Sequence, residues 1–343
     1  MNNSKIKVIL IGYGHIGKRH ATVISNSPTF ELTAVVDAHP ISKKNAPDAV
    51  APFFSSITAF SQSGLSADLA VIATPNGLHA GHIDQCLDLG LDVVAEKPIV
   101  LSHKQLTILQ QKAVEKGLHL FPVVQNRYAP ISLWLQQLLS QQLLGKIYII
   151  QITCLWNRDA RYYQKGSWHG DLALDGGSLY TQFLHFVDML YWLFGQPDIQ
   201  HVTLQDFNHQ QLSAFEDSGV IQFSFQGGAA KDALATMTFS TAAWEKNAES
   251  ALTIMAENGS IKIGGQYMEQ IIYAIGSFTE DHPISNDQLN EAFHVKYGAA
   301  AGHYKYWEEL SKYYQGEPAQ LPTLEEAAQV IDIIEKIYHH NKG

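Results

Sequence analysis

The chain contains only two cysteines, Cys86 and Cys154, among its 343 residues. They form no CxxC pair and show no disulfide spacing, so a reducing cytoplasm is the simplest compartment to expect. Long hydrophobic runs are also lacking, since no stretch approaches the roughly 20 apolar residues of a membrane span. The apolar run over residues 6–11 is too short for the core of a signal peptide. We therefore expect a cytoplasmic protein with no membrane partner.

Positive charge is scarce as well. The 23 Lys and Arg residues stand against 33 Asp and Glu residues, which gives a formal net charge of −10. This balance argues against a nucleic acid or an anionic membrane surface as a partner. The sixteen histidines show no HExxH or other clustered ligand spacing, so we predict no metal. Apolar residues make up 46% and charged residues 16% of the chain, a globular composition that offers no case for disorder.

A glycine-rich turn, Gly12-Tyr13-Gly14-His15-Ile16-Gly17, follows the run 6–11 and leads into a helical pattern over 15–25. This is the context that a dinucleotide-binding fingerprint requires. Gly12 allows the tight turn, Gly14 lets the backbone approach a pyrophosphate, and Gly17 lets the helix pack close to the strand. The pyrophosphate would lie on the helix N-terminus, where free N–H groups and the helix dipole favour an anion.

Asp37 supports this interpretation because it ends the next strand-like segment, 20 residues beyond Gly17. A carboxylate at that place accepts hydrogen bonds from ribose hydroxyls and repels a 2′-phosphate. We therefore predict that the cofactor is NAD and that NAD is preferred over NADP. The alternative is a glycine turn in an ordinary α/β domain.

Strand and helix patterns alternate over the first part of the chain. Continuous apolar strands suit a parallel sheet that is covered on both faces. This predicts an α/β Rossmann domain, a doubly wound parallel sheet, over residues 1–122. The expected strands are 6–11, 31–36, 69–73, 92–95 and 118–123, and the expected helices are 15–25, 78–89 and 102–116.

The pattern changes after residue 122, where β-rich segments are grouped together between helices. Such grouping predicts a C-terminal α+β domain with one large, mainly antiparallel sheet over residues 123–343. The expected helices are 130–140, 177–194, 300–315 and 323–340, and the expected strands are 147–156, 200–207, 217–225, 233–240, 250–256, 260–263 and 267–273.

Two polar segments directly follow buried strands of the first domain. They would meet at the carboxyl ends of the sheet, where doubly wound folds bind ligands. Thr74, Pro75 and Asn76, with His79 one turn on, would lie beside the ribose and nicotinamide of the cofactor. The same residues also suit a strand that is stopped by proline and followed by a helix.

The second segment is Glu96-Lys97-Pro98. A lysine at the end of a strand, between Glu and Pro, is oddly placed for a solvated surface charge. Pro98 restricts Lys97 to extended conformations. A cation there could hydrogen-bond an alkoxide as it becomes a carbonyl. Residue chemistry alone leaves both a catalytic and a structural role open.

A third candidate segment lies in the second domain. Thr181 and His185 are spaced i, i+4, and Asp188 is i+3 from His185. In the continuous helix expected over 177–194 all three share one face. His185 could take a hydroxyl proton near neutral pH, or it could be a hydrogen-bonded structural histidine. Asp188 suits an anchor of the helix better than a reacting group.

Five motifs, GYGHIG, TPNGLH, EKP, VVQNRY and DGGSLYTQFLHFVDML, occur in an order and spacing that resemble the glucose–fructose oxidoreductase / inositol dehydrogenase (Gfo/Idh/MocA) family. The resemblance covers nearly the whole chain. It implies an NAD-dependent oxidoreductase that acts on CH–OH groups, with an open-faced sheet in a second domain that binds substrate. It also implies a homo-oligomer, a dimer or tetramer, packed through the sheets. Lys97 and His185 would then flank the reacting carbinol.

The segments 125–128 and 156–163, together with Trp168, resemble one branch of this family. The branch includes bacterial UDP-N-acetylglucosaminuronate 3-dehydrogenases of surface-polysaccharide synthesis, which oxidise a sugar C3 hydroxyl with NAD. The charged and aromatic side chains of 156–163 could supply the contacts that a nucleotide-sugar needs. Alternatively, they belong to a surface loop with unrelated charges.

The resemblance implies a set of contacts with each ligand. Those with the cofactor come from Gly12, Gly14, His15, Ile16, Gly17, Asp37, Thr74, Pro75, Asn76, His79, Glu96, Lys97 and Gln125. Those with the substrate come from Lys97, Arg127, Arg158, Arg161, Tyr163, Trp168, Thr181, Gln182 and His185. The segment 302–304, which begins a late helix, also resembles a family segment near the active site.

One position departs from the family pattern. Many of its polyol and sugar dehydrogenases carry Asp four residues before the histidine, where this chain has Thr181. A threonine hydroxyl can hold a hydrogen bond but cannot store a proton at neutral pH. His185 would then act as base without the help of a carboxylate. Three alternatives stay open: a dehydrogenase of a free polyol or aldose, an enzyme that cleaves glycosides through C3 oxidation, and a non-catalytic regulator that binds NAD or a sugar.

Overall fold

The structure is a computed structural model, and it describes residues 5–39, 51–265, 268–278 and 301–341. Residue 267 of one expected strand and residue 300 of one expected helix lie outside these ranges. By its contacts the chain divides into two units. The first comprises Met1–Val124 and His303–Ala328, and the second comprises Gln125–Gly302 and Gln329–Gly343. The expected division lay after residue 122, and it assigned no segment from the end of the chain to the first domain.

The first unit is built on six parallel strands. They lie in the order β3-β2-β1-β4-β5-β6, so the chain reverses its direction of winding between β1 and β4. This is the doubly wound fold that the strand and helix pattern predicted. The place where the winding reverses is called the switch point, and folds of this kind bind their ligands there. The strands are β1 (Ile6–Ile11), β2 (Phe30–Val36), β3 (Phe53–Phe54), β4 (Leu69–Ile72), β5 (Asp92–Ala95) and β6 (Leu120–Pro122).

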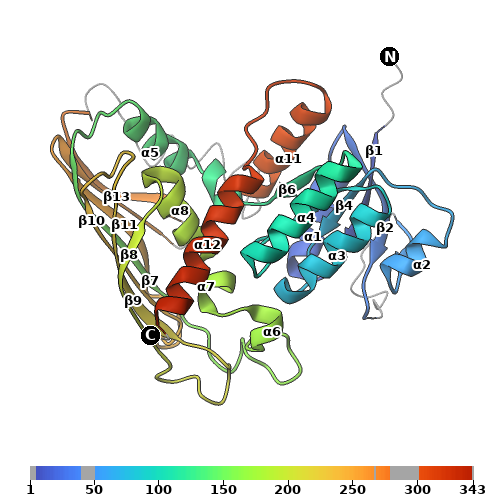
Figure 1. The fold of residues 1–343 in the computed structure, drawn as a ribbon, viewed down its shortest axis with the longest axis horizontal. Helices are drawn as coiled ribbons and strands as arrows, with labels where there is room; N and C mark the ends of the chain where they lie inside the picture. Colours follow the sequence, from blue (N-terminus) through green and yellow to red (C-terminus); the bar gives the residue numbers. More distant parts are fainter. Residues whose placement is uncertain (1–4, 40–50, 266–267, 279–300, 342–343) are drawn as a thin grey trace. The chain divides into compact units, whose positions relative to one another are not determined.

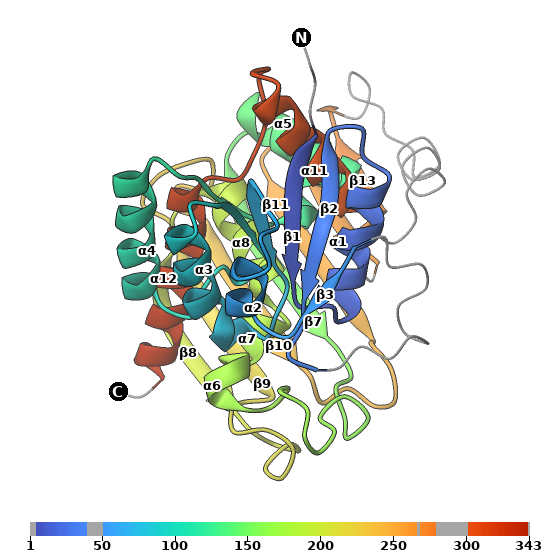
Figure 2. The ribbon, with the colours of Figure 1, turned by 90° about the vertical axis from the view of Figure 1, so that its right-hand side faces the viewer.

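Helices cover both faces of this sheet. In Figure 2, α1 lies on one side of the strands, while α3 and α4 lie on the other. The short elements β3 and α2 were not predicted, because two and five residues are too few for a period to show. The helices are α1 (His15–Ser25), α2 (Ile57–Ser61), α3 (His79–Asp88), α4 (His103–Lys116) and, from His303 on, α11 (Ala301–Tyr314), with the 3₁₀ turn η1 (Asn76–Leu78) before α3.

The second unit is built on seven strands in the order β13-β12-β11-β7-β10-β9-β8. Only the pair β7–β10 is parallel, and the other pairs are antiparallel, so the mainly antiparallel sheet that we predicted is confirmed. The strands are β7 (Ile147–Leu155), β8 (Asp198–Gln205), β9 (Ser218–Ser224), β10 (Leu234–Ser240), β11 (Glu249–Ala256), β12 (Gly259–Gly264) and β13 (Gln270–Gly276).

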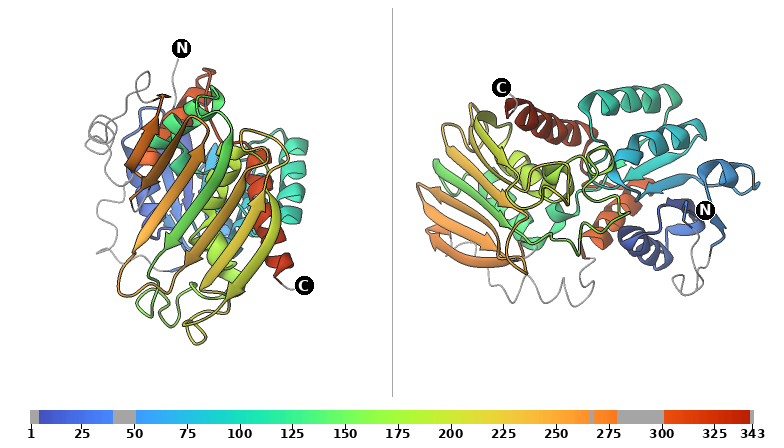
Figure 3. Two further views of the ribbon diagram at one scale, coloured as in Figure 1. Left: turned by 90° about the vertical axis from the view of Figure 1, so that its left-hand side faces the viewer. Right: turned by 90° about the horizontal axis from the view of Figure 1, so that it is seen from below.

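Helices of the second unit pack on one face of its sheet (Figure 1 and Figure 3, right). Aromatic rings form this contact: Phe183 lies 5.0 Å from Phe239 of β10, centroid to centroid, and 5.3 Å from Trp156. Burying one such ring stabilises the fold by roughly 1.5–3 kcal/mol. The helices are α5 (Pro130–Ser140), α6 (Leu172–Asp175), α7 (Ser178–Thr181), α8 (Leu184–Phe194) and, from Gln329 on, α12 (Leu324–His340), and the 3₁₀ turn η2 (Gln125–Tyr128) begins the unit.

The helix expected over 177–194 is interrupted, and this part of the prediction was wrong. Phe183 leaves the helical conformation at φ −111° and ψ 4°, so α7 ends at Thr181 and α8 begins at Leu184. The physical reason is packing, since the break turns the ring of Phe183 into the core. Thr181 and His185 therefore belong to different helices and do not share one helical face.

The other face of the seven-stranded sheet carries none of the unit's described helices (Figure 3, left). Its pairing places Leu234 beside Ile149, and Ile149 beside Met255. Ser260 then joins Met255 to Ile275 across β12. Leu234 is 68% exposed and Ile275 is 67% exposed, so an apolar row crosses this open face. Among the described helices, none combines the length and apolarity that a membrane crossing would need.

Candidate active site

The fingerprint turn lies at the switch point between β1 and β4. Gly12 has φ 93°, and a Cβ atom there would lie 2.5 Å from the carbonyl oxygen of Ala73, directly after β4. A Cβ atom at Gly17 would lie 2.0 Å from the carbonyl oxygen of Gly12. At Gly14, by contrast, a Cβ atom would meet nothing within 4 Å. Gly12 and Gly17 are thus required because a side chain at either position would overlap the backbone. Gly14 instead leaves open space at the start of α1.

This open space has the chemistry of a pyrophosphate site. Gly14 is the N-cap of α1, and no side chain caps the first N–H groups of that helix. Such groups favour an anion. Asp37 completes the arrangement at the end of β2: its Oδ2 accepts the N–H of Tyr13 at 2.7 Å, and its Oδ1 accepts the N–H of His39 at 2.9 Å. Each carboxylate oxygen keeps lone-pair capacity for a ribose hydroxyl, so these residues fit an NAD molecule.

The segments after β4 and β5 are tied together by His79. Its ring is buried, with Nδ1 2.7 Å from the carbonyl oxygen of Pro98 and Nε2 2.8 Å from that of Thr74. Burial lowers the pKa of His79, although the two carbonyls oppose this. The Thr74 hydroxyl lies 3.0 Å from Nδ1 of His82. His79 was predicted to touch the cofactor; in the structure its two ring nitrogens face backbone carbonyls and thereby join these two segments.

Lys97 is half-buried, and its peptide bond with Pro98 is cis. Its backbone N–H donates to Oε2 of the preceding Glu96 at 3.1 Å. Oε1 of Glu96 lies 3.0 Å from Nε2 of both His20 and His303. The Glu96 carboxylate is therefore a buried anchor of the backbone at Lys97.

In the second unit, η2 and α8 bring Gln125 and His185 together. Nε2 of the Gln125 amide lies 3.2 Å from Nε2 of His185. Because the amide nitrogen can only donate, Nε2 of His185 is the acceptor and has a lone pair. A half-buried imidazole nitrogen of this kind can take a proton from a hydroxyl group.

Arg127 was predicted to bind substrate, but its guanidinium is committed within the unit. Its Nε donates to Oδ2 of Asp188 at 3.0 Å, and an Nη donates to Oδ1 at 2.6 Å. Both side chains are buried, and the guanidinium also lies over the ring of Trp192. Since this pair joins η2 to α8, it fixes the two elements that carry Gln125 and His185.

Arg158 and Gln182 meet in a second polar group. Nε of Arg158 donates to Oε1 of Gln182 at 2.7 Å, and Nε2 of Gln182 donates to the hydroxyl of Tyr162 at 2.7 Å. The Arg158 guanidinium lies 4.9 Å from the ring of Trp156. This Arg158 cluster, namely Trp156, Arg158, Tyr162 and Gln182, combines a fixed positive charge with aromatic faces, which suits a charged sugar derivative.

The other predicted substrate residues of this loop differ in their exposure. Arg161 is exposed, and both its Nε and an Nη donate to the carboxylate of Asp159, whose pKa it lowers to about 2. The ring of Trp168 lies 3.9 Å from that of His169, centroid to centroid, with the two planes tilted by 39°. Tyr163 is buried and lies against His209 at 5.3 Å, centroid to centroid. Tyr163 thus packs within this loop.

A buried carboxylate supports Thr181. The Thr181 hydroxyl donates to Oδ1 of Asp175, and Oδ2 of Asp175 accepts the N–H of Gly170 at 3.0 Å. Thr181, which stands four residues before His185, thus has the carboxylate of Asp175 from α6 as its partner. Sequence spacing alone could not reveal this contact, because the turn at 176–177 brings Asp175 back onto α7.

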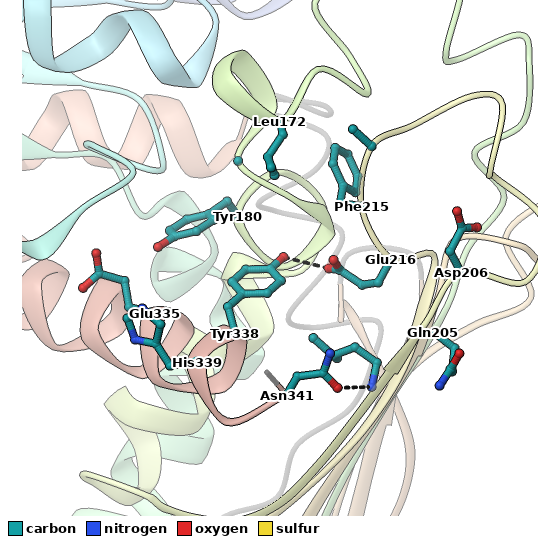
Figure 4. A pocket seen from close by; sticks show the side chains of 13 residues that line it. Leu172, Tyr180, Gln205, Asp206, Phe215, Glu216, Glu335, Tyr338, His339 and Asn341 are labelled. Carbon is teal, nitrogen blue, oxygen red and sulfur yellow. Dashed lines mark hydrogen bonds between the residues drawn. The ribbon is translucent and has the colours of Figure 1, made fainter. Parts of the chain in front are cut away.

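A cavity of about 490 Å³ lies beside the same turn (Figure 4). On its wall, the hydroxyl of Tyr338 accepts the N–H of Leu179 at 3.2 Å and donates to Glu216 at 2.7 Å. Ser178 also donates to Glu216, at 2.5 Å. A Cβ atom at Gly177 would lie 2.2 Å from the Tyr338 hydroxyl, so glycine is required for this contact. The C-terminal helix thereby holds the start of α7.

Several residues of these groups were not predicted from the sequence. Their spacing follows no motif, and only the folded chain brings them to the candidate residues. They are His20, Glu216, Trp307 and Tyr338.

Comparison with known families agrees with this geometry. Residues 6–123 match the family model described as oxidoreductase family, NAD-binding Rossmann fold. Residues 136–342 match its companion, described as oxidoreductase family, C-terminal alpha/beta domain. The chain belongs to the Gfo/Idh/MocA family. The family resemblance and the NAD-binding domain that the sequence motifs predicted are both confirmed.

Solved structures of this family resemble the chain over its full length. The WlbA dehydrogenase from Bordetella pertussis, in complex with NADH and UDP-GlcNAcA, has a TM-score of 0.88 at 26% identity and covers 100% of this chain and 97% of its own. The corresponding complex of WlbA from Chromobacterium violaceum has a TM-score of 0.84 at 26% identity, with 100% and 95% covered.

Curated relatives of the Gfo/Idh/MocA family match over shorter stretches. A scyllo-inositol 2-dehydrogenase (NADP(+)) of Bacillus subtilis is 28% identical over 231 residues, which is 65% of this chain and 63% of that protein. The matches to the first curated relatives cover less than two thirds of their length.

Substitutions of the fingerprint glycines should separate folding from cofactor binding. Gly14→Ala should fold with an unchanged melting temperature but bind NAD at least about tenfold more weakly, because the new methyl group occupies the pyrophosphate space. Gly12→Ala should lower the melting temperature, because it is strained at positive φ and overlaps Ala73. Thermal unfolding and a fluorescence titration with NADH measure both effects. Normal NADH affinity in Gly14→Ala would refute the assignment.

The charge of Asp37 should set the choice between NAD and NADP. Asp37→Asn keeps the shape and one acceptor oxygen but removes the charge that repels a 2′-phosphate. We expect the ratio of the NADP and NAD dissociation constants to fall about tenfold or more. Glu31→Gln, an exposed position on the same strand, is the matched control and should leave the ratio unchanged. Equal affinity of the unaltered protein for both cofactors would contradict the prediction.

Proposed function

We propose that the protein is an NAD-dependent dehydrogenase that oxidises the C3 hydroxyl of a UDP-N-acetyl-hexosaminuronate, or a related nucleotide-sugar, to a ketone. Such a step belongs to the synthesis of surface polysaccharides. The observation that carries the choice of substrate is the likeness over the whole chain to WlbA, which was crystallised with NADH and UDP-GlcNAcA. The Arg158 cluster supports it, since a carboxylated and phosphorylated sugar needs cationic and aromatic partners.

The chemistry divides between two side chains of the protein. NAD, when bound, supplies the acceptor for the hydride. His185 takes the hydroxyl proton at Nε2, and the substrate hydroxyl replaces the Gln125 amide as the partner of that lone pair. Lys97 hydrogen-bonds the substrate oxygen as it changes from alkoxide to carbonyl. The Arg127–Asp188 pair keeps His185 and Gln125 in register.

A dehydrogenase of a free polyol or aldose is the second candidate. It is favoured by the curated relative that acts on scyllo-inositol. An enzyme of this kind would need the same lysine and histidine but no partner for a nucleotide. A regulator that binds NAD or a sugar would need neither residue for its function.

A single-turnover assay tests the proposal and both alternatives. Stoichiometric protein and NAD are mixed with UDP-N-acetylglucosaminuronate, UDP-N-acetylglucosamine, inositol or glucose, and the absorbance of reduced nicotinamide is followed. We expect a rise with the UDP-sugar acid. A rise only with a free sugar would favour the second candidate. No rise with any of them, while NAD binds, would contradict a dehydrogenase.

The same assay identifies the reacting residues. Lys97→Met and His185→Asn should each lower the rate of reduction at least about a hundredfold, because each removes an acid–base group. NADH affinity should stay within about threefold of the unaltered protein. Lys104→Met, which removes an exposed lysine of α4, is the control and should react normally. Near-normal rates in either variant would remove that residue from the mechanism.

We also propose a homo-oligomer packed through the open face of the seven-stranded sheet. The apolar row from Leu234 to Ile275 supports it, because exposed apolar patches on a sheet mark contact surfaces. Replacing both residues by Lys should yield a smaller species in analytical ultracentrifugation. Ile108→Lys on α4, which alters an equally apolar exposed position, should not change the mass. An unchanged mass in the double variant would refute this interface.

A further inference from the structure

Glu96 stands at the centre of a buried hydrogen-bonded network in the first unit. Oε1 accepts from Nε2 of His20 and of His303, each at 3.0 Å, and Oε2 accepts the backbone N–H of Lys97 at 3.1 Å. Nε1 of Trp307 lies 3.0 Å from Nδ1 of His20. The four side chains are almost completely buried. They join α1, the turn after β5 and α11, three segments that are far apart in the sequence.

The direction of each hydrogen bond follows from Trp307. An indole nitrogen can only donate, so Nδ1 of His20 must accept. The proton of a neutral His20 then lies on Nε2, which points at Glu96. Trp307 therefore selects the one tautomer of His20 that can donate to the carboxylate.

Three N–H groups stabilise a buried negative charge on Glu96. Burial would raise the pKa of Glu96, but the N–H groups of His20 and His303 hold the pKa of this carboxyl well below its ordinary value. Burial lowers the pKa of His303, and the hydrogen bond to Glu96 only opposes this. Accepting three N–H groups favours the ionised form of a carboxylate. Oε1 accepts two of these groups and Oε2 the third, so the hydrogen bonds fix the orientation of the side chain at both oxygens.

Two histidines and a glutamate could also suggest a metal site, since their ligand atoms lie within 4.8 Å of one another. The hydrogen bond from Trp307 argues against this. A histidine that binds metal through Nε2 carries its proton on Nδ1 and donates it to an acceptor. At His20 the group that faces Nδ1 is itself a donor. The chemistry of the cluster is therefore that of a hydrogen-bonded support.

The network acts on the backbone that carries Lys97. Glu96 holds the N–H of Lys97, and His79 lies 2.7 Å from the carbonyl oxygen of Pro98 on the other side. The backbone is thus fixed on both sides of the lysine. A displacement of a reacting group by about 1 Å can cost on the order of a hundredfold in rate, so such support has kinetic consequences.

We propose that His20, His303 and Trp307 are positioning residues, which hold the Glu96 carboxylate in the one orientation that fixes the backbone of Lys97 and, through it, the place of the lysine amine. The kinetic part of this inference rests on the proposed function of Lys97. The structural part does not, because the place of the amine can be measured without substrate.

Trp307→Phe is the decisive variant, because it removes one N–H group and keeps a ring against Phe30. Trp134→Phe is its matched control, since Nε1 of Trp134 is buried with no hydrogen-bond partner among the described residues. The full chain is labelled by reductive ¹³C-methylation of its lysines, and Lys97→Arg identifies the Lys97 signal. We expect Trp307→Phe and Glu96→Gln to shift or broaden that signal, and Trp134→Phe to leave it unchanged.

The rate of the single-turnover reaction is measured on the same variants. Trp307→Phe should lower it about tenfold or more, while NADH affinity stays within about threefold. If Trp307→Phe does not fold, His303→Asn, which keeps an N–H donor of shorter reach, takes its place. An unmoved Lys97 signal in these variants overturns the positioning role, whatever the rates are. A moved signal in a protein that reduces no NAD with any sugar supports positioning and refutes the proposed function.

Discussion

The first unit depends on one constraint: the connections that follow the paired strands β1 and β4 leave the sheet on opposite faces. Directly after β1 the backbone passes so close to the end of β4 that a Cβ atom at Gly12 would overlap Ala73. The tight turn leads α1 away from the sheet and leaves its first N–H groups uncapped. Strands β4 and β5 end at the same edge, which brings Thr74 and Lys97 to the place where the dinucleotide would lie.

Buried carboxylates organise the functional segments of both units. Glu96 accepts three N–H groups and fixes the turn of Lys97. Asp188 forms a two-point ion pair with Arg127 and fixes α8. Asp175 holds Thr181 and the N–H of Gly170. A buried charge is costly unless each of its oxygens has a donor, so a carboxylate of this kind allows only one arrangement of the surrounding segments. The same requirement that satisfies the charge therefore orders the candidate site.

The limits of an element could be predicted closely where the apolar pattern is clear and residues at its two ends mark where it stops. Helices α1 and α5 and strand β5 have the expected limits. The prediction failed over 177–194, where the apolar pattern continues through Phe183 although the helix does not. A ring that packs against the sheet overrides helical propensity, and no local pattern reveals that contact. Elements as short as β3 carry no periodic signal at all.

The sequence by itself determined the cofactor fingerprint, the order of a parallel and a mainly antiparallel sheet along the chain, and the family to which the chain belongs. These features depend on residues that are close together in the chain, or on motifs in a fixed order. The tertiary structure alone decided which buried partners His79 and Arg127 have, and that Trp307 of α11 donates to Nδ1 of His20. Such pairings join residues up to 287 positions apart. They exist only once packing has excluded water and each buried polar atom has to find a partner within the protein.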